Sequence, residues 1–400
     1  MKKIVLQMKS CVYKFVKAKG LSAVVAGLVI VLFVLITSET DSLIDVTFFT
    51  SILCAIILEG ATHFASNIII NQLEDSAKLT TDYEQLIKSY KADWYTYKKV
   101  KFPIIFYGWV YKKDIRIADN PEKMYQLPEE IKNNFEEIIA AHDTSTTYNS
   151  YMIRVDDWEV KDDVFEMSTS RTTYFNSLGT NRAIDYRWKS GLSIRSLLEY
   201  GPYVRELSES QLSNHLGYNG FIESADGYIL FIKRSKRVSI GKNTYGTGIS
   251  ASLKTRYALN ERKILDADGI KQAFVEEINK EVGLKEKDLC SFSLENGLIS
   301  VYRDFVEGGK PQFMFYVKAK LDRKDINSIF FGKSGRLLRS DRDQVDIDGN
   351  RWVWIKRNDL LNAEVFSSGM RCRGRKYKMM PSASACVAML VEYLRDEAVN

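Results

Sequence analysis

One stretch of the chain, residues 269–284, has a pattern that allows little besides an amphipathic helix. Its large apolar residues recur every four positions and so form one stripe on a helix, made by Ile270, Phe274, Ile278 and Val282. Asp268 is expected to cap the start, because a short carboxylate accepts hydrogen bonds from the first free backbone N–H groups. Gly283 can adopt the left-handed conformation that ends a helix, and Leu284 then folds back onto it. The sequence therefore predicts a capped helix over Gly269–Leu284.

Two carboxylates on this helix are candidates for chemistry. Glu277 and Glu281 are four residues apart, so both project from the same side, away from the apolar stripe. They fit a magnesium site, because Mg²⁺ prefers oxygen ligands and often takes only one or two carboxylates plus phosphate oxygens. They fit equally a solvated acidic face that binds nothing, and the residues alone leave both interpretations open.

The second half of the stretch, Glu276–Leu284, resembles the Nudix box, the phosphate-site helix of the Nudix hydrolase superfamily. That family has Arg-Glu-apolar-any-Glu-Glu-any-Gly-apolar at this place. Glu277 matches the first Glu of the pattern, Glu281 matches the last, and Gly283 and Leu284 match its end. The resemblance implies that Glu277 and Glu281 bind Mg²⁺ and, in a hydrolase, take part in splitting a diphosphate linked to another moiety.

The box also departs from the family pattern. Glu276 stands where the family has Arg, and Lys280 stands where it has the first Glu of the pair. Asp268 and Arg262 occupy the earlier Glu and Gly positions. Lys280 replaces a carboxylate with a cation, which lowers metal affinity and can itself meet a phosphate. We therefore expect a Nudix fold that keeps a nucleotide pocket and has lost turnover, with Mg²⁺-dependent hydrolysis as the alternative.

The flanks of the box extend the resemblance to roughly residues 214–400. Gly220–Ser235 is typical of a strand, an Asp-Gly turn and a second strand. The other segments that match the family in order are Gly246–Leu253, Phe313–Leu321, Trp352–Ile355, the short turn Asn358–Leu361 and the closing helix Ser382–Leu394. The resemblance implies an α/β fold, namely a Nudix-like α/β/α sandwich with a mixed sheet.

The N-terminal part, residues 1–75, predicts a two-helix transmembrane hairpin. Leu21–Thr37 and Val46–Leu58 are apolar, lysines precede the first run, and only acidic charges lie between the two. A signal peptide fits less well, because the basic region is long and a second apolar run follows closely. The positive-inside tendency places both chain ends in the cytoplasm, so the expected location is a bacterial inner membrane crossed twice.

Glu59, His63 and Asn67 line one edge of the second span at a spacing of four residues. Polar groups inside a membrane usually face protein or water, which predicts a seam between helices used on oligomerisation. Alternatively, the helix leaves the bilayer near Glu59 and these groups lie among the lipid headgroups. The sequence leaves both possibilities open.

Residues 76–213 predict a linker helix and an α+β segment without a motif. Residues 72–100 are expected to be helical, because Leu79, Tyr83, Leu86 and Tyr90 form a stripe. The expected strands are Phe102–Tyr111, Tyr151–Val155 and Val164–Ser168, and short helices are expected within Pro121–Ala141 and Gly191–Gly201.

Composition narrows the possible chemistry. The net charge of +6 permits an anionic partner without requiring one. Five scattered cysteines without a CxxC pair disfavour a disulfide frame, and three histidines disfavour a His-based triad or zinc site.

Two basic loops are candidates for phosphate contacts, one with Arg234 and Lys236 and one with Arg373 and Arg375, although such loops are often only solvated. No nucleic-acid motif or P-loop is present, so DNA and RNA are not expected partners.

Two membrane spans joined to a degenerate Nudix-like domain resemble the transmembrane-Nudix effectors of bacterial cyclic-oligonucleotide-based antiphage signalling. The resemblance implies that the cytoplasmic domain binds a cyclic oligonucleotide and that the chain forms homo-oligomers. The clustered hairpins would then disrupt the lipid bilayer and cause abortive infection. The alternatives are a membrane-anchored Mg²⁺-dependent Nudix hydrolase of a nucleoside diphosphate derivative and a passive membrane scaffold.

Overall fold

The computed structural model describes residues 79–142, 149–188, 191–234, 241, 243–331 and 352–399. The predicted hairpin over residues 1–75, with Glu59, His63 and Asn67, lies outside these ranges, as does Lys236. Among the described residues, no helix is both long and apolar enough to cross a membrane. The hairpin and the inner-membrane location therefore stay predictions.

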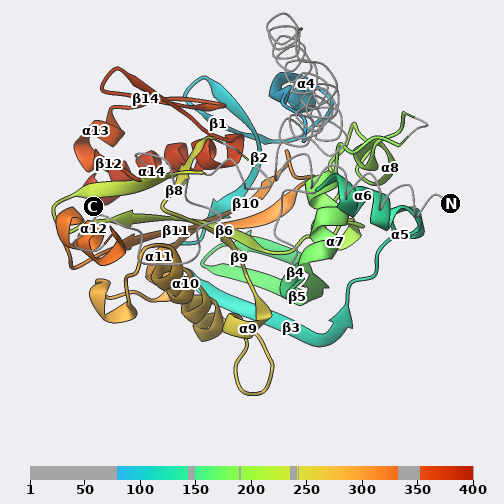
Figure 1. Ribbon diagram of the computed structural model, residues 1–400, viewed down its shortest axis with the longest axis horizontal. Helices are drawn as coiled ribbons and strands as arrows, with labels where there is room; N and C mark the ends of the chain where they lie inside the picture. The colour runs from blue at the N-terminus through green and yellow to red at the C-terminus, as the bar shows by residue number, and fades with distance from the viewer. Residues whose placement is uncertain are drawn as a thin grey trace, which may run out of the picture. The chain divides into compact units, whose positions relative to one another are not determined.

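The architecture is mixed α/β, as the sequence predicted. Within the described ranges nine strands form the main sheet, in the order β1-β2-β10-β11-β6-β7-β12, with β8 on β7 and β9 on β6 (Figure 1). These strands are β1 (Trp94–Tyr97), β2 (Val100–Trp109), β6 (Gly217–Glu223), β7 (Tyr228–Lys233), β8 (Tyr245–Thr247), β9 (Ile249–Ser252), β10 (Leu298–Asp304), β11 (Lys310–Lys318) and β12 (Trp352–Lys356). β11 and β6 pair in parallel, and the other pairs are antiparallel, so the sheet is mixed.

Side chains of the central strands alternate between two cores on opposite faces of this sheet. In β11, Phe313 and Phe315 pack on the face that α10 (Ala267–Glu281) covers. Met314 and Tyr316 point to the other face, which α14 (Pro381–Val399) covers (Figure 1). This alternation follows from the two-residue repeat of a strand, and an entirely buried run such as β11 is what a sheet covered on both faces requires.

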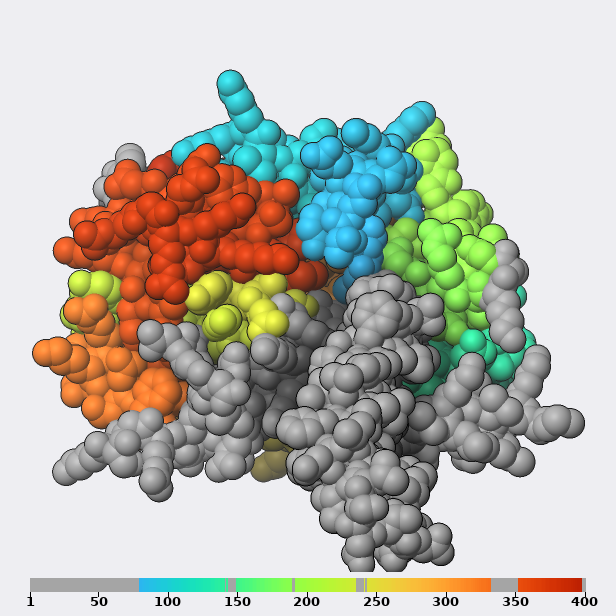
Figure 2. Space-filling view, turned by 45° about the horizontal axis from the view of Figure 1, so that its top comes forward, coloured from blue at the N-terminus to red at the C-terminus, as the bar shows by residue number. Residues whose placement is uncertain are grey.

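The α14 face is closed by elements from both ends of the described chain. The small sheet β13 (Glu364–Phe366), β14 (Gly369–Cys372) and β15 (Arg375–Lys378) joins the α14 core, as does α13 (Arg357–Leu361). Tyr95 and Phe102 of the β1–β2 hairpin pack into the same core. Figure 2 shows the blue and cyan surface of this early segment beside the red C-terminal surface.

A second three-stranded sheet packs on the α10 side, in the order β3-β5-β4. It consists of β3 (Asp114–Met124), β4 (Tyr151–Lys161) and β5 (Val164–Thr173). The remaining described helices are α4 (Tyr83–Lys88), α5 (Glu129–Asn133), α6 (Phe135–Ala141), α7 (Tyr174–Gly179), α8 (Ile194–Leu198), α9 (Thr255–Ala258), α11 (Leu294–Gly297) and α12 (Arg323–Phe331), with the 3₁₀ turns η1 (Asn181–Ala183), η2 (Leu207–Glu209) and η3 (Glu286–Asp288).

Two local predictions were wrong in detail. The helix α10 begins two residues early, because Asp266 rather than Asp268 is its cap, with Asp266 Oδ1 accepting from the Gly269 N–H at 2.8 Å. The long helix expected over residues 72–100 is, within the described residues, only α4, and the chain then enters β1. The aromatic residues of Trp94–Tyr97 favour a strand that can pair with β2, and that pairing overrides the apolar spacing.

The predicted boundary between residues 213 and 214 stays a prediction. Strands from both sides of it, β1 and β2 before and β6 to β12 after, share the main sheet. The segment before residue 214 therefore supplies part of the framework on which the C-terminal elements rest.

Candidate functional site

The helix α10 is held between the main sheet and the short helix α9. Its apolar stripe is buried as predicted, and Phe274 stacks on Phe315 of β11 with ring centres 4.0 Å apart. A Cβ at Gly269 would lie 1.9 Å from the Ala258 carbonyl oxygen, so only glycine allows α9 to approach this closely. Gly283 has φ of +92° and ends the helix, as predicted. Both sides of α10 are therefore packed.

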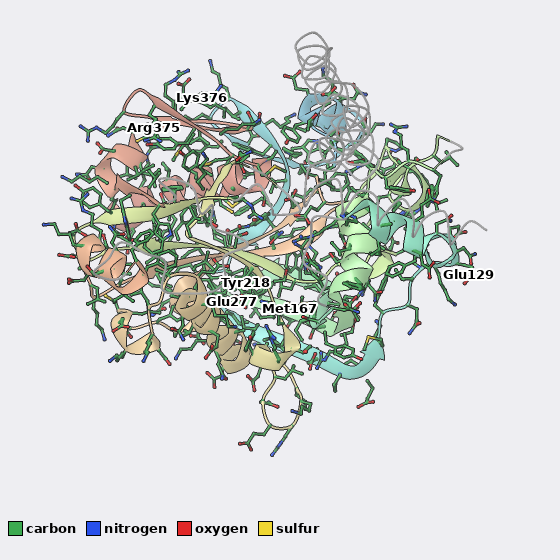
Figure 3. The ribbon with its side chains drawn as sticks, viewed as in Figure 1. Glu129, Met167, Tyr218, Glu277, Arg375 and Lys376 are labelled. Atoms are coloured by element: carbon green, nitrogen blue, oxygen red, sulfur yellow. The ribbon has the colours of Figure 1, made fainter. Side chains whose placement is uncertain are left out.

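This packing buries the two carboxylates that were expected on an open face. Glu277 is 3% exposed and Glu281 is 6% exposed, so the solvated-face interpretation is wrong. Figure 3 shows Glu277 close to Tyr218 of β6, on the inner side of α10. Buried carboxylates are rare unless they are paired or hydrogen-bonded, so their partners define what the site can do.

Glu277 is paired with two lysines. Lys254 follows β9 and its Nζ donates to Glu277 Oε1 at 2.9 Å. Lys280, one helical turn further along α10, has its Nζ 3.6 Å from the same oxygen. The Lys280 ammonium also lies 3.3 Å from the centre of the Tyr257 ring, a cation–π contact that holds it in place. We call Lys254, Glu277, Lys280 and Glu281 the helix ion cluster.

Glu281 contacts the backbone of β9. Its Oε2 accepts from the Ser250 N–H at 3.4 Å, and the Ser250 hydroxyl accepts from Arg234 Nη1 at 3.3 Å. Burial and the negative charge of Glu277 raise the pKa of Glu281 well above its usual range, although Lys254 and Arg234 oppose the shift. The structure thus brings Arg234, predicted as a ligand-binding residue, to the end of α10.

The helix ion cluster does not fit Mg²⁺. A magnesium ion needs several oxygen ligands in a near-octahedral arrangement, and Glu277 is already paired with two ammonium groups. Within the ranges that the structure describes, no group of three His, Cys, Asp or Glu residues is placed to hold a metal. What the cluster offers is cationic nitrogen donors, which suit an anion.

The second basic loop is not part of this site. Arg375 donates to the Tyr245 hydroxyl at 3.2 Å, and the mostly exposed Arg373 lies 3.5 Å from Asp359. Figure 3 shows Arg375 on the other side of the sheet from Glu277, in agreement with the packing of β15 on α14. Their role in ligand binding stays a prediction, and any such role would be separate from α10.

Sequence reasoning missed three contributors, namely Lys254, Tyr257 and Ser250. All three lie in or just after the segment predicted as the strand and turn before the box. The segment itself was found, but no pattern indicated which of its side chains would face α10. The pairing of β9 with β6 settles that orientation, and it is a contact between segments distant in sequence.

A separate surface hollow of about 340 Å³ lies between β2, β4 and the loop before β6. Its lining includes the aromatic rings of Tyr107 and Trp158 and three carboxylates, those of Asp157, Glu159 and Glu206. Three negative charges disfavour an anion at this place. The hollow is therefore no candidate for binding a nucleotide phosphate.

Comparisons with known proteins identify no family. No protein-family model and no curated protein matches the chain. Among solved structures, the chain is similar to the crystal structure of DR0079 from Deinococcus radiodurans, with 14% sequence identity and a TM-score of 0.22 over 37% of this chain and 70% of that one. A similarity this low carries no argument about fold family or function.

Proposed function

We propose that the chain is a membrane-anchored receptor for a cyclic oligonucleotide, in which a Nudix-like domain binds the messenger without hydrolysing it. The observation that carries the proposal is the double pairing of Glu277 with Lys254 and Lys280. A carboxylate in such a pair is a poor metal ligand, and the lysines are good partners for a phosphate. The resemblance of Glu277, Glu281, Gly283 and Leu284 to the Nudix box supports the same place as a phosphate site.

The consequence proposed for binding is clustering of the N-terminal hairpins in the bacterial inner membrane. A ligand can drive such a change only if it binds the clustered state more tightly than the dispersed one. Breach of the bilayer by clustered hairpins would then act as an antiphage defence through abortive infection.

The test is binding to the purified full-length chain in lipid nanodiscs. Calorimetry against a panel of cyclic di- and trinucleotides, with Mg²⁺ present, should give one saturable ligand that chromatography afterwards recovers intact. Light scattering of detergent-solubilised protein should report a larger particle with that ligand. Cleavage of a linear nucleoside diphosphate derivative, with no response to any cyclic ligand, would instead establish the Mg²⁺-dependent hydrolase.

A further inference from the structure

A second group of buried charges lies at the turn between β10 and β11. Arg182 Nε and Lys310 Nζ lie 3.6 Å and 3.5 Å from the same oxygen, Glu307 Oε2. Asp304 is the register partner of Lys310 across the two strands. We call Arg182, Asp304, Glu307 and Lys310 the turn ion cluster. Lys310 is only 3% exposed, which is unusual for a lysine.

One oxygen of the turn ion cluster is left without a hydrogen bond within the described residues. Glu307 Oε2 is buried and accepts no hydrogen bond within the described part of the chain. Both of its cation contacts are longer than a good charged hydrogen bond. Buried polar atoms are nearly always hydrogen-bonded, and a half-satisfied charged network is less stable than an apolar packing of the same volume. Stability alone therefore does not explain these residues.

A buried histidine lies beside the two cations of this cluster. This residue, His215, has its Nε2 2.9 Å from the Ser252 hydroxyl, and its Nδ1 has no hydrogen-bond partner among the described residues. Burial and the positive charges of Lys310 and Arg182 hold the pKa of His215 well below its usual range. Burial and the negative charge of Glu307 raise the pKa of Asp304 to about 7, so near neutrality part of the acidic charge is lost.

The turn ion cluster and the helix ion cluster lie at the same end of the main sheet. Gly217 of β6 pairs with Gln312 of β11 on one side and with Ser252 of β9 on the other. Lys310, the first residue of β11, and Lys254, two residues after the end of β9, therefore both lie near the start of β6. The strands β11 and β9 are about 10 Å apart, because neighbouring strands are spaced by roughly 4.8 Å.

Arg234 connects the two clusters electrostatically. Burial and the positive charge of Arg182 lower the pKa of Arg234, while Glu281 and Glu307 raise it. Its charge thus interacts with members of both groups. Its guanidinium contacts the Ser250 hydroxyl at 3.3 Å, on the residue whose backbone N–H donates to Glu281.

We propose that the turn ion cluster is a second phosphate subsite, in which Arg182 and Lys310 bind a further phosphate of the same ligand. The inference rests on the proposed function and specifies its ligand, which must carry at least two separated phosphate groups. In the absence of ligand the Glu307 carboxylate pairs with both cations, and the phosphate takes the place of this carboxylate when the ligand binds. Glu307 is thereby an internal competitor of the ligand.

This inference gives a role to the segment before residue 214. Arg182 lies in η1, and the neighbouring Asn181 Nδ2 donates to the Glu307 carbonyl oxygen and to Asn214 Oδ1, both at 3.0 Å. Gly308 and Gly309, with φ of +68° and +81°, let the turn fold back against this segment. The second subsite is thus assembled from two parts of the chain that are distant in sequence.

The test compares Lys310→Gln with Glu307→Gln. If the cluster were only structural, the two substitutions would not change ligand affinity in opposite directions. In full-length protein in nanodiscs, Lys310→Gln should weaken binding of cyclic di-AMP, cyclic di-GMP or cyclic tri-AMP, whichever the wild type binds, by about tenfold. Glu307→Gln should tighten binding of the same probe several-fold, because it removes the competitor. Lys318→Gln, which removes an exposed ion pair with Glu397, is the matched control and should leave affinity unchanged. Thermal unfolding of each variant checks its fold, and Arg182→Gln replaces Lys310→Gln if the latter does not fold.

The outcomes separate this inference from the proposed function. A wild type that binds none of the three probes would overturn both. A wild type that binds, with Glu307→Gln weakening the affinity or with neither substitution changing it, would overturn only the second subsite. Opposite effects of Lys310→Gln and Glu307→Gln would establish it.

Discussion

The two helices that cover the main sheet differ in what they bury. In α14 the residues from Ala385 to Val391 are all apolar and fully buried. In α10 an equally apolar stripe is accompanied by Glu277 and Glu281, which are buried as well. Burying charge costs free energy unless its partners are well placed, so α14 has the composition of a purely structural element and α10 does not. The comparison supports the α10 face as the place of the proposed site.

The largest expected effect tests whether the apolar stripes of the two helices are equivalent. Phe274→Ala in α10 and Leu390→Ala in α14 should each lower the free energy of unfolding by about 3–5 kcal/mol, because both remove fully buried side chains and leave cavities. Urea unfolding followed by near-ultraviolet circular dichroism measures both. A loss below about 1 kcal/mol for either helix would contradict its position in a core.

The next effect concerns the charges that only α10 buries. Lys254→Met should lower the free energy of unfolding by about 3 kcal/mol, because it removes the closest partner of a buried carboxylate. Adding Glu277→Gln should restore most of that loss, since the uncompensated charge is then absent. The control is Lys318→Met, whose exposed pair with Glu397 on α14 should be worth less than about 1 kcal/mol. Equal effects of Lys254→Met and Lys318→Met would remove the contrast between the two helices.

A smaller effect is expected at two glycines with positive φ. Gly374 in the β14–β15 turn has open space around a Cβ, so Gly374→Ala should cost about 1 kcal/mol from backbone strain alone. At Gly283, which ends α10, a Cβ would lie 2.8 Å from Ile329 Cγ2, so Gly283→Ala should cost somewhat more. Thermal unfolding of the two variants gives the difference. A smaller cost at Gly283 would show that the end of α10 is loosely packed.

The smallest expected effect is a pH dependence from Asp304, whose pKa is raised to about 7 by burial and by the negative charge of Glu307. A carboxyl whose folded-state pKa lies above its unfolded value contributes stability at low pH that is lost as pH rises through the folded value. Between pH 6 and pH 8 the contribution of this group should fall by about 1 kcal/mol. Asp304→Asn should flatten this part of the stability profile. An unchanged slope in that variant would assign the dependence to other groups.

Much of the fold followed from local patterns. The stripe Ile270, Phe274, Ile278 and Val282 predicted α10, and the Asp-Gly turn predicted the β6–β7 hairpin, because both signals lie within a few neighbouring residues. The strand β1 was missed because its signal is not local. Its identity depends on pairing with β2, whereas the tyrosine and leucine spacing before it is that of a helix.

The candidate site was only partly predictable. The box pattern identified Glu277, Glu281 and Lys280, and the basic loop identified Arg234. The burial of the carboxylates depends on how β9 and α9 pack over α10, and the partner Lys254 is 23 residues away from Glu277 in sequence. The turn between β10 and β11 contains Gly308 and Gly309, both with positive φ, as a tight turn between two strands requires. Its closeness to Arg182 depends on tertiary packing and has no local signal.

The most direct test of the account is whether the α10 carboxylates bind a divalent metal. Mn²⁺ is titrated into purified full-length protein and its free fraction is measured by electron paramagnetic resonance, for the wild type and for Glu277→Gln. The account predicts that the two proteins leave the same fraction of Mn²⁺ free, because Lys254 and Lys280 already neutralise Glu277. One stoichiometric Mn²⁺ site in the wild type that Glu277→Gln abolishes would contradict the account. It would favour the alternative, a hydrolase in which these carboxylates bind the metal.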